Sequence, residues 1–341
     1  MGFDIIGDIH GHARELEALL AKLGYEEKSG AYRHPDGRRV VFLGDYIDRG
    51  PGILRVLEVV RAMVETGNAY AVMGNHELNA LHYATRDPLS TKADPYLRSH
   101  SEAHHRQCAA TFSQLDAAQI NRWLDWMMSL PLWLKLKDKA GRELRFIHAA
   151  WNENDIRRFW KARDADGKPL LTGSIDAPRL TPEGLMETGR RRHPVTKKTS
   201  LAFLLKSSLI TGPEAALPKG QCYYDKEGTE RRAFRIRWWV KPGPETTLID
   251  MMMAGRRSRM TLAGGGADRP FTVDFKPYPV MGPTFVGHYW LDPEELGPLT
   301  DKVACLDFSV ARGGLLAAYR WEPGDKALLK ERFVTVEAVK D

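Results

Sequence analysis

The chain has 341 residues, of which 43% are hydrophobic and 28% are charged, and its formal net charge is +6. This composition indicates a soluble globular protein and argues against a disordered or fibrous chain. No apolar run approaches the roughly 18 residues that a membrane span requires. The N-terminus has neither the basic nor the apolar region of a secretory signal, and the three cysteines are widely spaced. We therefore expect a cytoplasmic protein that does not bind a membrane.

The first 80 residues predict strands that alternate with helices. "FDIIGD", "RRVVFLGD" and "AYAVMGN" are short apolar segments typical of buried strands. Between them, residues 12–25 and 52–67 carry apolar side chains at helical spacing. Strand–helix–strand units of this length favour a layered α/β architecture with largely parallel strands.

The remainder of the chain is less regular. Residues 86–130 begin polar and end in the helical pattern "QINRWLDWMMSL", which predicts a helical insert over the sheet edge. Residues 156–259 hold 22 Lys and Arg against 11 Asp and Glu, and "RRAFRIRWWV" within them predicts a strand. Further strands are expected at 143–149, in "GPTFVGHYW", and on both sides of an "RGG" turn near residue 313. The basic middle segment is suited to attracting an acidic or phosphorylated substrate.

Polar side chains follow five of the predicted strands directly. They are Asp8 and His10; Asp45, Asp48 and Arg49; Asn75, His76 and Glu77; His148; and His288. Ligands of α/β sheets bind beyond the carboxyl ends of the strands, so these side chains are expected to converge on one site. Asp, Asn and His without Cys form an oxygen and nitrogen ligand set, which suits Mn, Fe, Zn, Co or Ni. Their number predicts two divalent ions that share one carboxylate.

Three of these motifs, "GDIHG", "GDYIDRG" and "GNHE", together with the later histidines, resemble the phosphoprotein phosphatase (PPP) family of binuclear metallophosphoesterases. The resemblance implies a calcineurin-like metallophosphoesterase fold of the α/β (α+β) class, in which two mixed β-sheets pack as a sandwich flanked by helices. It is dense over residues 1–80 and continues at positions 148 and 288. We expect one domain over 1–341, with a helical insert at about 86–130 and a basic insert at about 156–260.

The resemblance also implies roles for individual residues. The first metal ion is expected on Asp8 and His10, with Asp45 between both ions and with Asn75, His148 and His288 on the second. His76 is expected to protonate the leaving oxygen, and Asp48 to orient it. Arg49, with Asn75, is expected to bind the substrate phosphate. Glu77 is expected at most to contact the ligand residues, without binding an ion itself. A second phosphate-binding arginine is expected upstream of His288, with Arg237, Arg256 and Arg257 as candidates.

The expected reaction is hydrolysis of a phosphomonoester by in-line attack of a metal-bridging hydroxide, with Mn as the favoured metal. The main expectation is a protein Ser/Thr phosphatase acting on phosphoproteins or small phosphoesters. A diadenosine polyphosphate hydrolase is the alternative. The resemblance disfavours it because such enzymes commonly carry glutamine where this chain has His10. A non-catalytic phospho-ligand binding module is disfavoured by the presence of His76, Asp48 and Arg49. A nucleic-acid substrate is not favoured, and the sequence is silent on the oligomeric state.

Overall fold

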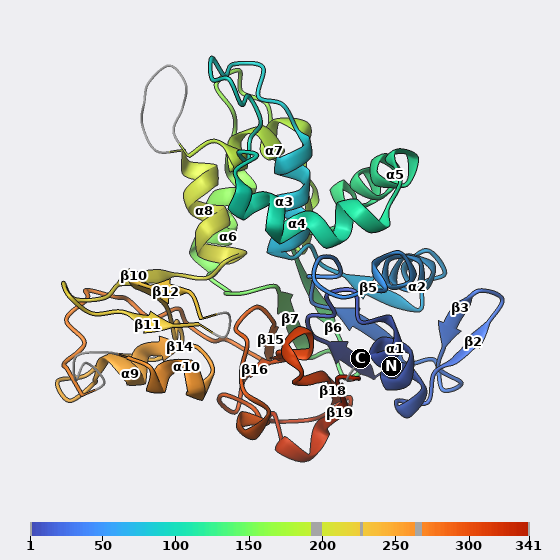
Figure 1. Ribbon diagram of the computed structural model, residues 1–341. Coiled ribbons are helices and arrows are strands. Elements are labelled where there is room, and N and C mark those ends of the chain that lie inside the picture. Colours follow the sequence, from blue (N-terminus) through green and yellow to red (C-terminus); the bar gives the residue numbers. More distant parts are fainter. Residues whose placement is uncertain (1, 192–199, 226–227, 263–267, 340–341) are drawn as a thin grey trace.

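The computed structural model describes residues 2–191, 200–225, 228–262 and 268–339. At its centre lie two β-sheets, with helices above and beside them (Figure 1). The first sheet has six strands in the order β17-β18-β1-β4-β5, with β19 paired to β18. Their bounds are β1 Phe3–Ile6, β4 Arg39–Phe42, β5 Ala69–Ala71, β17 Asp307–Phe308, β18 Leu315–Trp321 and β19 Phe333–Glu337.

The strands of the first sheet are mixed in direction. β1, β4 and β5 run parallel, as the alternating pattern predicted, whereas β18 pairs antiparallel with β1. β17 and β18 form the hairpin predicted around the "RGG" turn. Strand β19 was not predicted from the sequence, although its residues Phe333, Val334 and Val336 are of types that favour strands.

The second sheet has four strands in the order β16-β15-β7-β6. β15 pairs parallel with both neighbours, whereas β6 and β7 form an antiparallel pair. The bounds are β6 Trp133–Lys137, β7 Glu143–Ile147, β15 Thr284–Val286 and β16 Val303–Cys305. β7 and β15 lie where the sequence placed strands.

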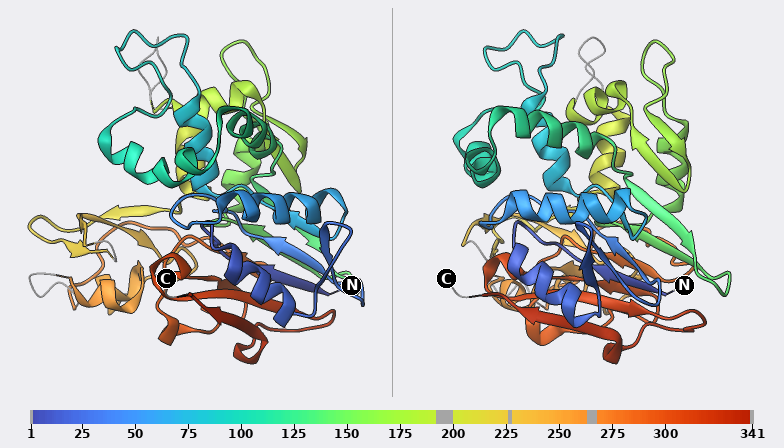
Figure 2. Two further views of the ribbon diagram at one scale, coloured as in Figure 1. Left: turned by 45° about the vertical axis from the view of Figure 1, so that its right-hand side comes forward. Right: turned by 90° about the vertical axis from the view of Figure 1, so that its right-hand side faces the viewer.

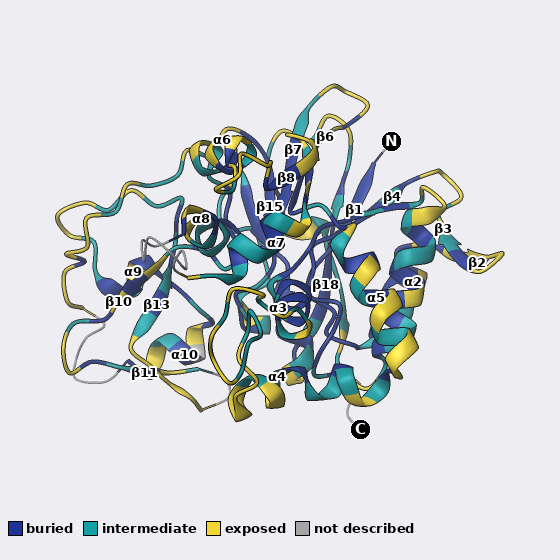
Figure 3. Cartoon of the chain, turned by 90° about the horizontal axis from the view of Figure 1, so that it is seen from above, coloured by how far each residue is buried: buried dark blue, intermediate teal, exposed yellow. Residues whose placement is uncertain are grey.

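The two sheets pack face to face through one hydrophobic cluster. Ile5 and Val41 from the first sheet share this cluster with Leu144, Phe146 and Phe285 from the second. All five side chains are fully buried, and the central strands are the most buried part of the chain in Figure 3. The predicted sandwich of two mixed sheets is therefore confirmed.

Helices cover the outer face of the first sheet. α1 (Ala13–Lys22) and α2 (Ile53–Glu65) place apolar residues such as Leu16 and Val56 in the main core. Both helices were predicted from their periodicity, and their ends agree with the prediction within about three residues. A small hairpin of β2 (Glu26–Lys28) and β3 (Ala31–Arg33) joins α1 to β4.

Six further helices lie together above the sandwich (Figures 1 and 2), and we call them the cap. They are α3 Asn75–Ala84, α4 Glu102–Gln114, α5 Ala117–Met128, α6 Glu153–Lys161, α7 Pro182–Gly189 and α8 Leu201–Leu209. α5 is the helix predicted from "QINRWLDWMMSL", and it begins with a capping box between Asp116 and Gln119. A hairpin of β8 (Leu171–Ser174) and β9 (Ala177–Leu180) connects α6 to α7.

The described residues between 211 and 280 form a small lobe beside the sandwich (Figure 1). Its elements are β10 Glu214–Ala216, β11 Tyr223–Tyr224, β12 Glu230–Arg231, β13 Ala233–Ile236, α9 Leu248–Met251, β14 Met252–Met253 and α10 Arg256–Met260. The lobe has its own hydrophobic cluster, which includes Phe234 and Ile236. The strand predicted in "RRAFRIRWWV" is β13, and it ends before the two tryptophans.

Three short 3-10 helices complete the described secondary structure: η1 Pro293–Glu295, η2 Val310–Arg312 and η3 Lys330–Arg332. Within the described ranges, none of the helices combines the length and the apolar character needed to cross a bilayer.

Candidate metal centre

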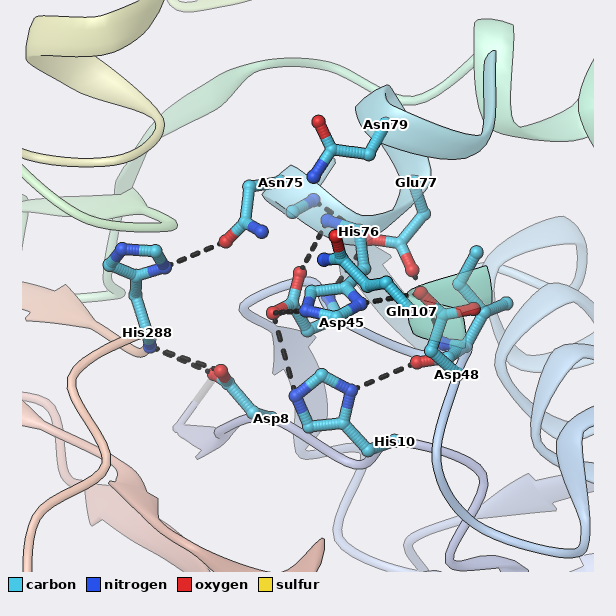
Figure 4. Close-up of polar contacts among 12 residues, drawn as sticks. Asp8, His10, Asp45, Asp48, Asn75, His76, Glu77, Asn79, Gln107 and His288 are labelled. Carbon is cyan, nitrogen blue, oxygen red and sulfur yellow. Dashed lines mark hydrogen bonds and ion pairs between the residues drawn. The ribbon is translucent and has the colours of Figure 1, made fainter. Parts of the chain in front are cut away.

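The loops that follow five strands of the two sheets meet at one place (Figure 4). From the first sheet they bring Asp8 and His10 after β1, Asp45, Asp48 and Arg49 after β4, and Asn75 and His76 after β5. From the second sheet they bring His148 after β7 and His288 after β15. The side chains predicted to converge therefore lie together, because the parallel strands deliver their carboxyl ends to the same edge.

Glycines allow these loops to touch each other. Gly44 has φ +98, and a Cβ there would lie 2.5 Å from the backbone nitrogen of Gly74. A Cβ on Gly287 would lie 2.0 Å from Asp8 Oδ1. Both contacts are too short for any side chain, so these positions require glycine. The loops after β4 and β5 therefore approach each other through their backbones, and the loop after β15 packs against the side chain of Asp8.

The site residues themselves adopt an unfavourable backbone conformation. Positive φ angles occur at His10 (47), Asp45 (53), Asp48 (67), Arg49 (73) and His288 (76). The other described non-glycine residues with positive φ are only Ser29, Trp290 and Ser309. This conformation is sterically disfavoured for residues with a Cβ. The strain is therefore concentrated at the predicted ligands and their neighbours, as is common at functional sites.

Two groups of potential ligand atoms share Asp45. In the first, atoms of His10, Asp45 and His76 lie within 4.8 Å of one another. In the second, the same is true of Asp45, His148 and His288. Nε2 of His10 is 3.6 Å from Asp45 Oδ2, and Nε2 of His148 is 3.3 Å from Asp45 Oδ1. Asp45 is thus the residue that the two groups have in common.

Two predicted ligands lie next to these groups. Asn75 Oδ1 is 2.9 Å from His148 Nε2 and 2.7 Å from His288 Nδ1. The carboxylate of Asp8 accepts the backbone N–H of His288 at 3.2 and 3.1 Å. These contacts bring Asn75 to the second group and fix Asp8 against the loop after β15.

Backbone carbonyls determine how two of the histidines face the centre. The Nδ1 atoms of His10 and His148 lie 2.9 Å from Ile47 O and 2.8 Å from Leu43 O, respectively. A carbonyl can only accept, so each Nδ1 carries a proton and each ring turns its Nε2 toward the centre. Nε2 of His10 is buried and has no hydrogen-bond partner. An orphaned lone pair beside buried carboxylates fits a metal ligand.

The electrostatic environment is that of a site built for cations. Burial, together with the Asp307 carboxylate, raises the pKa of Asp8 well above its usual value. Burial alone would lower the pKa of His148, but Asp45 and Asp8 outweigh it and raise that pKa to about 10. Burial, Arg49 and His76 lower the pKa of His10, which keeps it neutral. The neutral imidazole of His10 and the buried carboxylates are ligands that divalent transition metals prefer.

His76 and Asp48 form a buried pair at the edge of the centre. Nδ1 of His76 donates to Asp48 Oδ2 at 2.6 Å. Its Nε2 therefore faces Asp45, at 3.8 Å from Oδ2. Burial would lower the pKa of His76, but Asp45 and the hydrogen-bonded Asp48 raise it. The pair has the geometry of an oriented general acid.

Glu77 has a larger structural role than the sequence suggested. Its carboxylate accepts the backbone N–H groups of Gly74, Asp45 and Tyr46 at 2.9, 2.9 and 2.8 Å. Burial, with a contribution from Asp45, raises the pKa of Glu77 to about 7. Glu77 therefore joins the loop after β4 to the start of α3 by hydrogen bonds. This role could not be predicted from the motif "GNHE".

The structure also places near His288 an arginine, Arg235, that was not among the candidates from the sequence. Arg235 on β13 lines a cavity of about 160 Å³ together with His288, Trp290 and Arg231. It lies 3.0 Å from Glu214, and its charge contributes to lowering the pKa of His288. The alternation of buried Phe234 and Ile236 around it was a signal that Arg235 points out of the core of the lobe.

Of the three arginines proposed from the sequence, Arg237 and Arg256 do not line this cavity in the described structure. Arg237 has a buried Nε without a hydrogen-bond partner, and burial together with Arg259 lowers its pKa. Arg256 is exposed, and its backbone N–H donates to Glu295 at 2.8 Å. The side chain of Arg257 lies outside the described part of the chain. Arg49 lies over the ring of Trp290, with 4.0 Å from its Cζ to the ring centroid.

Comparison with known proteins gives a family match over half of the chain. A model of the calcineurin-like phosphoesterase family matches residues 1–171. Among curated proteins, the bis(5'-nucleosyl)-tetraphosphatase PrpE [asymmetrical] of Halalkalibacterium halodurans is 57% identical over 76 residues, which are 22% of this chain and 31% of that protein. PrpE of Oceanobacillus iheyensis is 50% identical over 76 residues, covering 22% of this chain and 30% of that protein. The chain thus matches less than a third of the length of these relatives.

Solved structures resemble the whole chain more distantly. A protein serine/threonine phosphatase from Saccharomyces cerevisiae aligns with a TM-score of 0.44 at 15% identity, covering 100% of this chain and 81% of that one. A cold-active protein-tyrosine phosphatase from a psychrophilic Shewanella species aligns with a TM-score of 0.43 at 16% identity, covering 99% and 80% of the two chains.

Proposed function

The chain belongs to the calcineurin-like phosphoesterase family, and from this premise we propose that it is a metal-dependent phosphohydrolase acting on dinucleoside polyphosphates. The observation that carries the hydrolytic chemistry is the position of Asp45 in two ligand groups beside the His76–Asp48 pair. The substrate class comes from the similarity to PrpE proteins over 76 residues, since their name describes tetraphosphate cleavage.

In this proposal Asp8, His10 and Asp45 would hold one divalent ion, and Asp45, Asn75, His148 and His288 the other. The family binds a binuclear centre, and we propose manganese as the metal because the ligand set of carboxylate, amide and imidazole suits it. When bound, such ions neutralise phosphate charge and supply a hydroxide nucleophile near neutral pH.

Protein side chains complete the reaction. His76 donates its Nε2 proton to the leaving oxygen, because Asp48 holds Nδ1 and turns Nε2 toward the centre. Arg49 binds the equatorial oxygens of the reacting phosphate, a task that suits its planar, bidentate guanidinium. We propose Arg235 as the second phosphate-binding arginine, because it shares a cavity with His288.

Protein Ser/Thr phosphatase activity, which the sequence favoured, is the second candidate. The buried acid His76 supports it, because a serine or threonine alkoxide leaves only after protonation, whereas a nucleotide phosphate is a better leaving group. The identity of residue 10 argues against a dinucleotide substrate, but it concerns a single position. The similarity to PrpE argues for such a substrate and extends over 76 residues at 57% identity, so we give it more weight.

A turnover comparison tests the proposal. Protein loaded with Mn²⁺ is incubated with diadenosine tetraphosphate and, at the same concentration, with a pool of phosphoserine and phosphothreonine peptides. We expect a higher kcat/KM for the dinucleotide, with unequal products (ATP and AMP). A higher value for the peptides would reverse the order of the two candidates. Protein with Asp45→Asn controls for contaminating phosphatases, since it should be inactive on both substrates.

A further inference from the structure

A large cavity lies within the cap, one helical turn from the metal centre. Its volume is about 820 Å³, and its walls come from α3, from the loop that precedes α4, from the end of α7 and from α8. Asn79 of α3 is part of the wall, and it follows the predicted ligand Asn75 by four residues, or about 6 Å along the helix. Figure 4 shows Asn79 on the same helix directly above Asn75.

The cavity wall carries an excess of positive charge. Five cationic side chains line it against the two carboxylates of Asp87 and Asp94. Both carboxylates are already bound. Asp87 accepts two hydrogen bonds from Arg190, at 3.1 and 2.5 Å, and Asp94 accepts the backbone N–H of His100 at 2.6 Å. Arg190 thus neutralises Asp87, and the four other cationic side chains outnumber the one remaining carboxylate, Asp94.

Lys206 is the clearest of these cations. Within the described part of the chain, no carboxylate lies within ion-pair distance of its Nζ, which instead sits 4.4 Å from the ring centroid of Phe203. Burial, with a contribution from Arg98, lowers the pKa of Lys206 to about 8. A half-buried ammonium without a counterion is unfavourable unless a ligand supplies the negative charge.

Arg98 connects the cavity to the catalytic pair. Its Nη1 donates to Asn79 Oδ1 at 2.9 Å and its Nη2 donates to Gln107 Oε1 at 2.5 Å, so both partners are neutral amides. Arg98 is also close enough to Asp48 for that carboxylate to influence its pKa. Asn79 and Arg98 thus form a polar part of the cavity wall on the side of the metal centre.

We propose that this cavity binds a second phosphate group of the substrate, with Lys206 and Arg98 as its ligands, while another phosphate of the same molecule reacts at the metal centre. The inference rests on the proposed function, because only a substrate with several phosphates reaches both places. A simple monoester has no group that extends into the cap. The cap therefore selects oligophosphates over small phosphoesters.

The test compares Lys206→Gln with the wild-type protein, both loaded with metal. Lys302→Gln is the matched control, since Lys302 is also half-buried but lies beside β16, outside the cavity. We expect Lys206→Gln to raise KM for diadenosine tetraphosphate about tenfold, which is the effect of losing one charge-assisted hydrogen bond. Its kcat/KM for p-nitrophenyl phosphate should stay within about twofold of the wild-type value, and Lys302→Gln should change neither.

Binding measurements separate this inference from the proposed function. The dissociation constants of inorganic tripolyphosphate and of a methylene-bridged diadenosine tetraphosphate are measured by calorimetry with the same proteins. A tenfold weaker affinity of both ligands for Lys206→Gln supports the phosphate site, even if the wild-type protein does not hydrolyse the dinucleotide. Weakening for the dinucleotide alone would mean that the cavity binds the nucleoside, and equal affinities for both proteins would refute the phosphate site.

Discussion

The hydroxyl of Thr111 donates to Asp48 Oδ1 at 2.5 Å, and the backbone N–H of Asp48 donates to Thr111 Oγ1 at 3.0 Å. Both residues are buried, and they are 63 positions apart in the chain. Gln114, on the same helix α4, accepts from Ile53 N–H and donates to Gly50 O. The cap thus holds the loop that carries Asp48, and through Asp48 it holds the ring of His76.

Thr111→Val should lower kcat about tenfold while leaving the metal content unchanged. The variant keeps the shape of the side chain but removes the hydroxyl, so Asp48 loses one of the bonds that orient it, and a buried bond to a charged group contributes roughly 1.5–3 kcal/mol. The measurement is kcat with metal analysis of the same sample. Thr111→Ser keeps the hydroxyl and should restore most of the activity; equal losses in both variants would assign the effect to packing.

His76→Asn should lower kcat by about 100-fold or more, the range typical of a lost general acid. Metal content should not change, because His76 is proposed to act on the leaving oxygen rather than on an ion. Substrates with an acidic leaving group, such as p-nitrophenyl phosphate, should be affected less than alkyl phosphates. Loss of one metal equivalent in this variant would instead make His76 a ligand with His10 and Asp45.

Asp45→Asn should reduce the bound metal below one equivalent per chain. The carboxamide has a single acceptor oxygen and no charge, so it cannot serve both ligand groups. Metal analysis after gel filtration provides the measurement, and Asp36→Asn on the exposed surface is a control with the same chemical change. Two equivalents of metal in Asp45→Asn would contradict the shared position of Asp45.

The stability of the protein should respond to pH through Lys206. Its pKa is about 8 in the folded protein against 10.5 when unperturbed, so between these values the unfolded chain binds more protons. The free energy of unfolding should therefore rise with pH across this window, and the cost of the buried charge should be fully present below pH 8. Lys206→Met should stabilise the protein at pH 7 by about 2 kcal/mol, after allowance for partial exposure.

Denaturant unfolding of wild-type protein and of Lys206→Met at pH 7 and at pH 10 measures this effect. The difference in unfolding free energy between the two proteins should shrink at the higher pH. Other titrating groups contribute equally to both proteins and therefore cancel in this difference. A constant difference at both pH values would show that Lys206 keeps an ordinary pKa.

The site residues that could be predicted from the sequence are those marked by a short local motif. Each predicted ligand follows its strand within a few residues, and a turn that ends in glycine and aspartate can be recognised without knowing its neighbours. Predictions failed where a contact spans the chain. The sequence around Thr111 does not indicate that it binds Asp48. The sequence around Lys206 does not indicate that its ammonium lacks a carboxylate partner.

The second arginine shows the same limit. Arg237 and Arg235 both lie in "RRAFRIRWWV", and only the packing of the lobe decides which of them lines a cavity with His288 and is therefore proposed to bind phosphate. The preference for phosphomonoesters rested on His10 alone. One such position says little about the leaving group, because a residue proposed to bind an ion does not contact the part of the substrate that departs.

The left-handed backbone at His10, Asp45, Asp48, Arg49 and His288 has a consequence for how this protein can change. At about 1 kcal/mol each, the five residues together cost about 5 kcal/mol, which is comparable to the entire net stability of many domains. Glycine at any of them would relieve the cost. The quickest route to a more heat-resistant chain therefore passes through substitutions that abolish its chemistry, and a search for thermostable variants without a screen for activity should recover inactive proteins first.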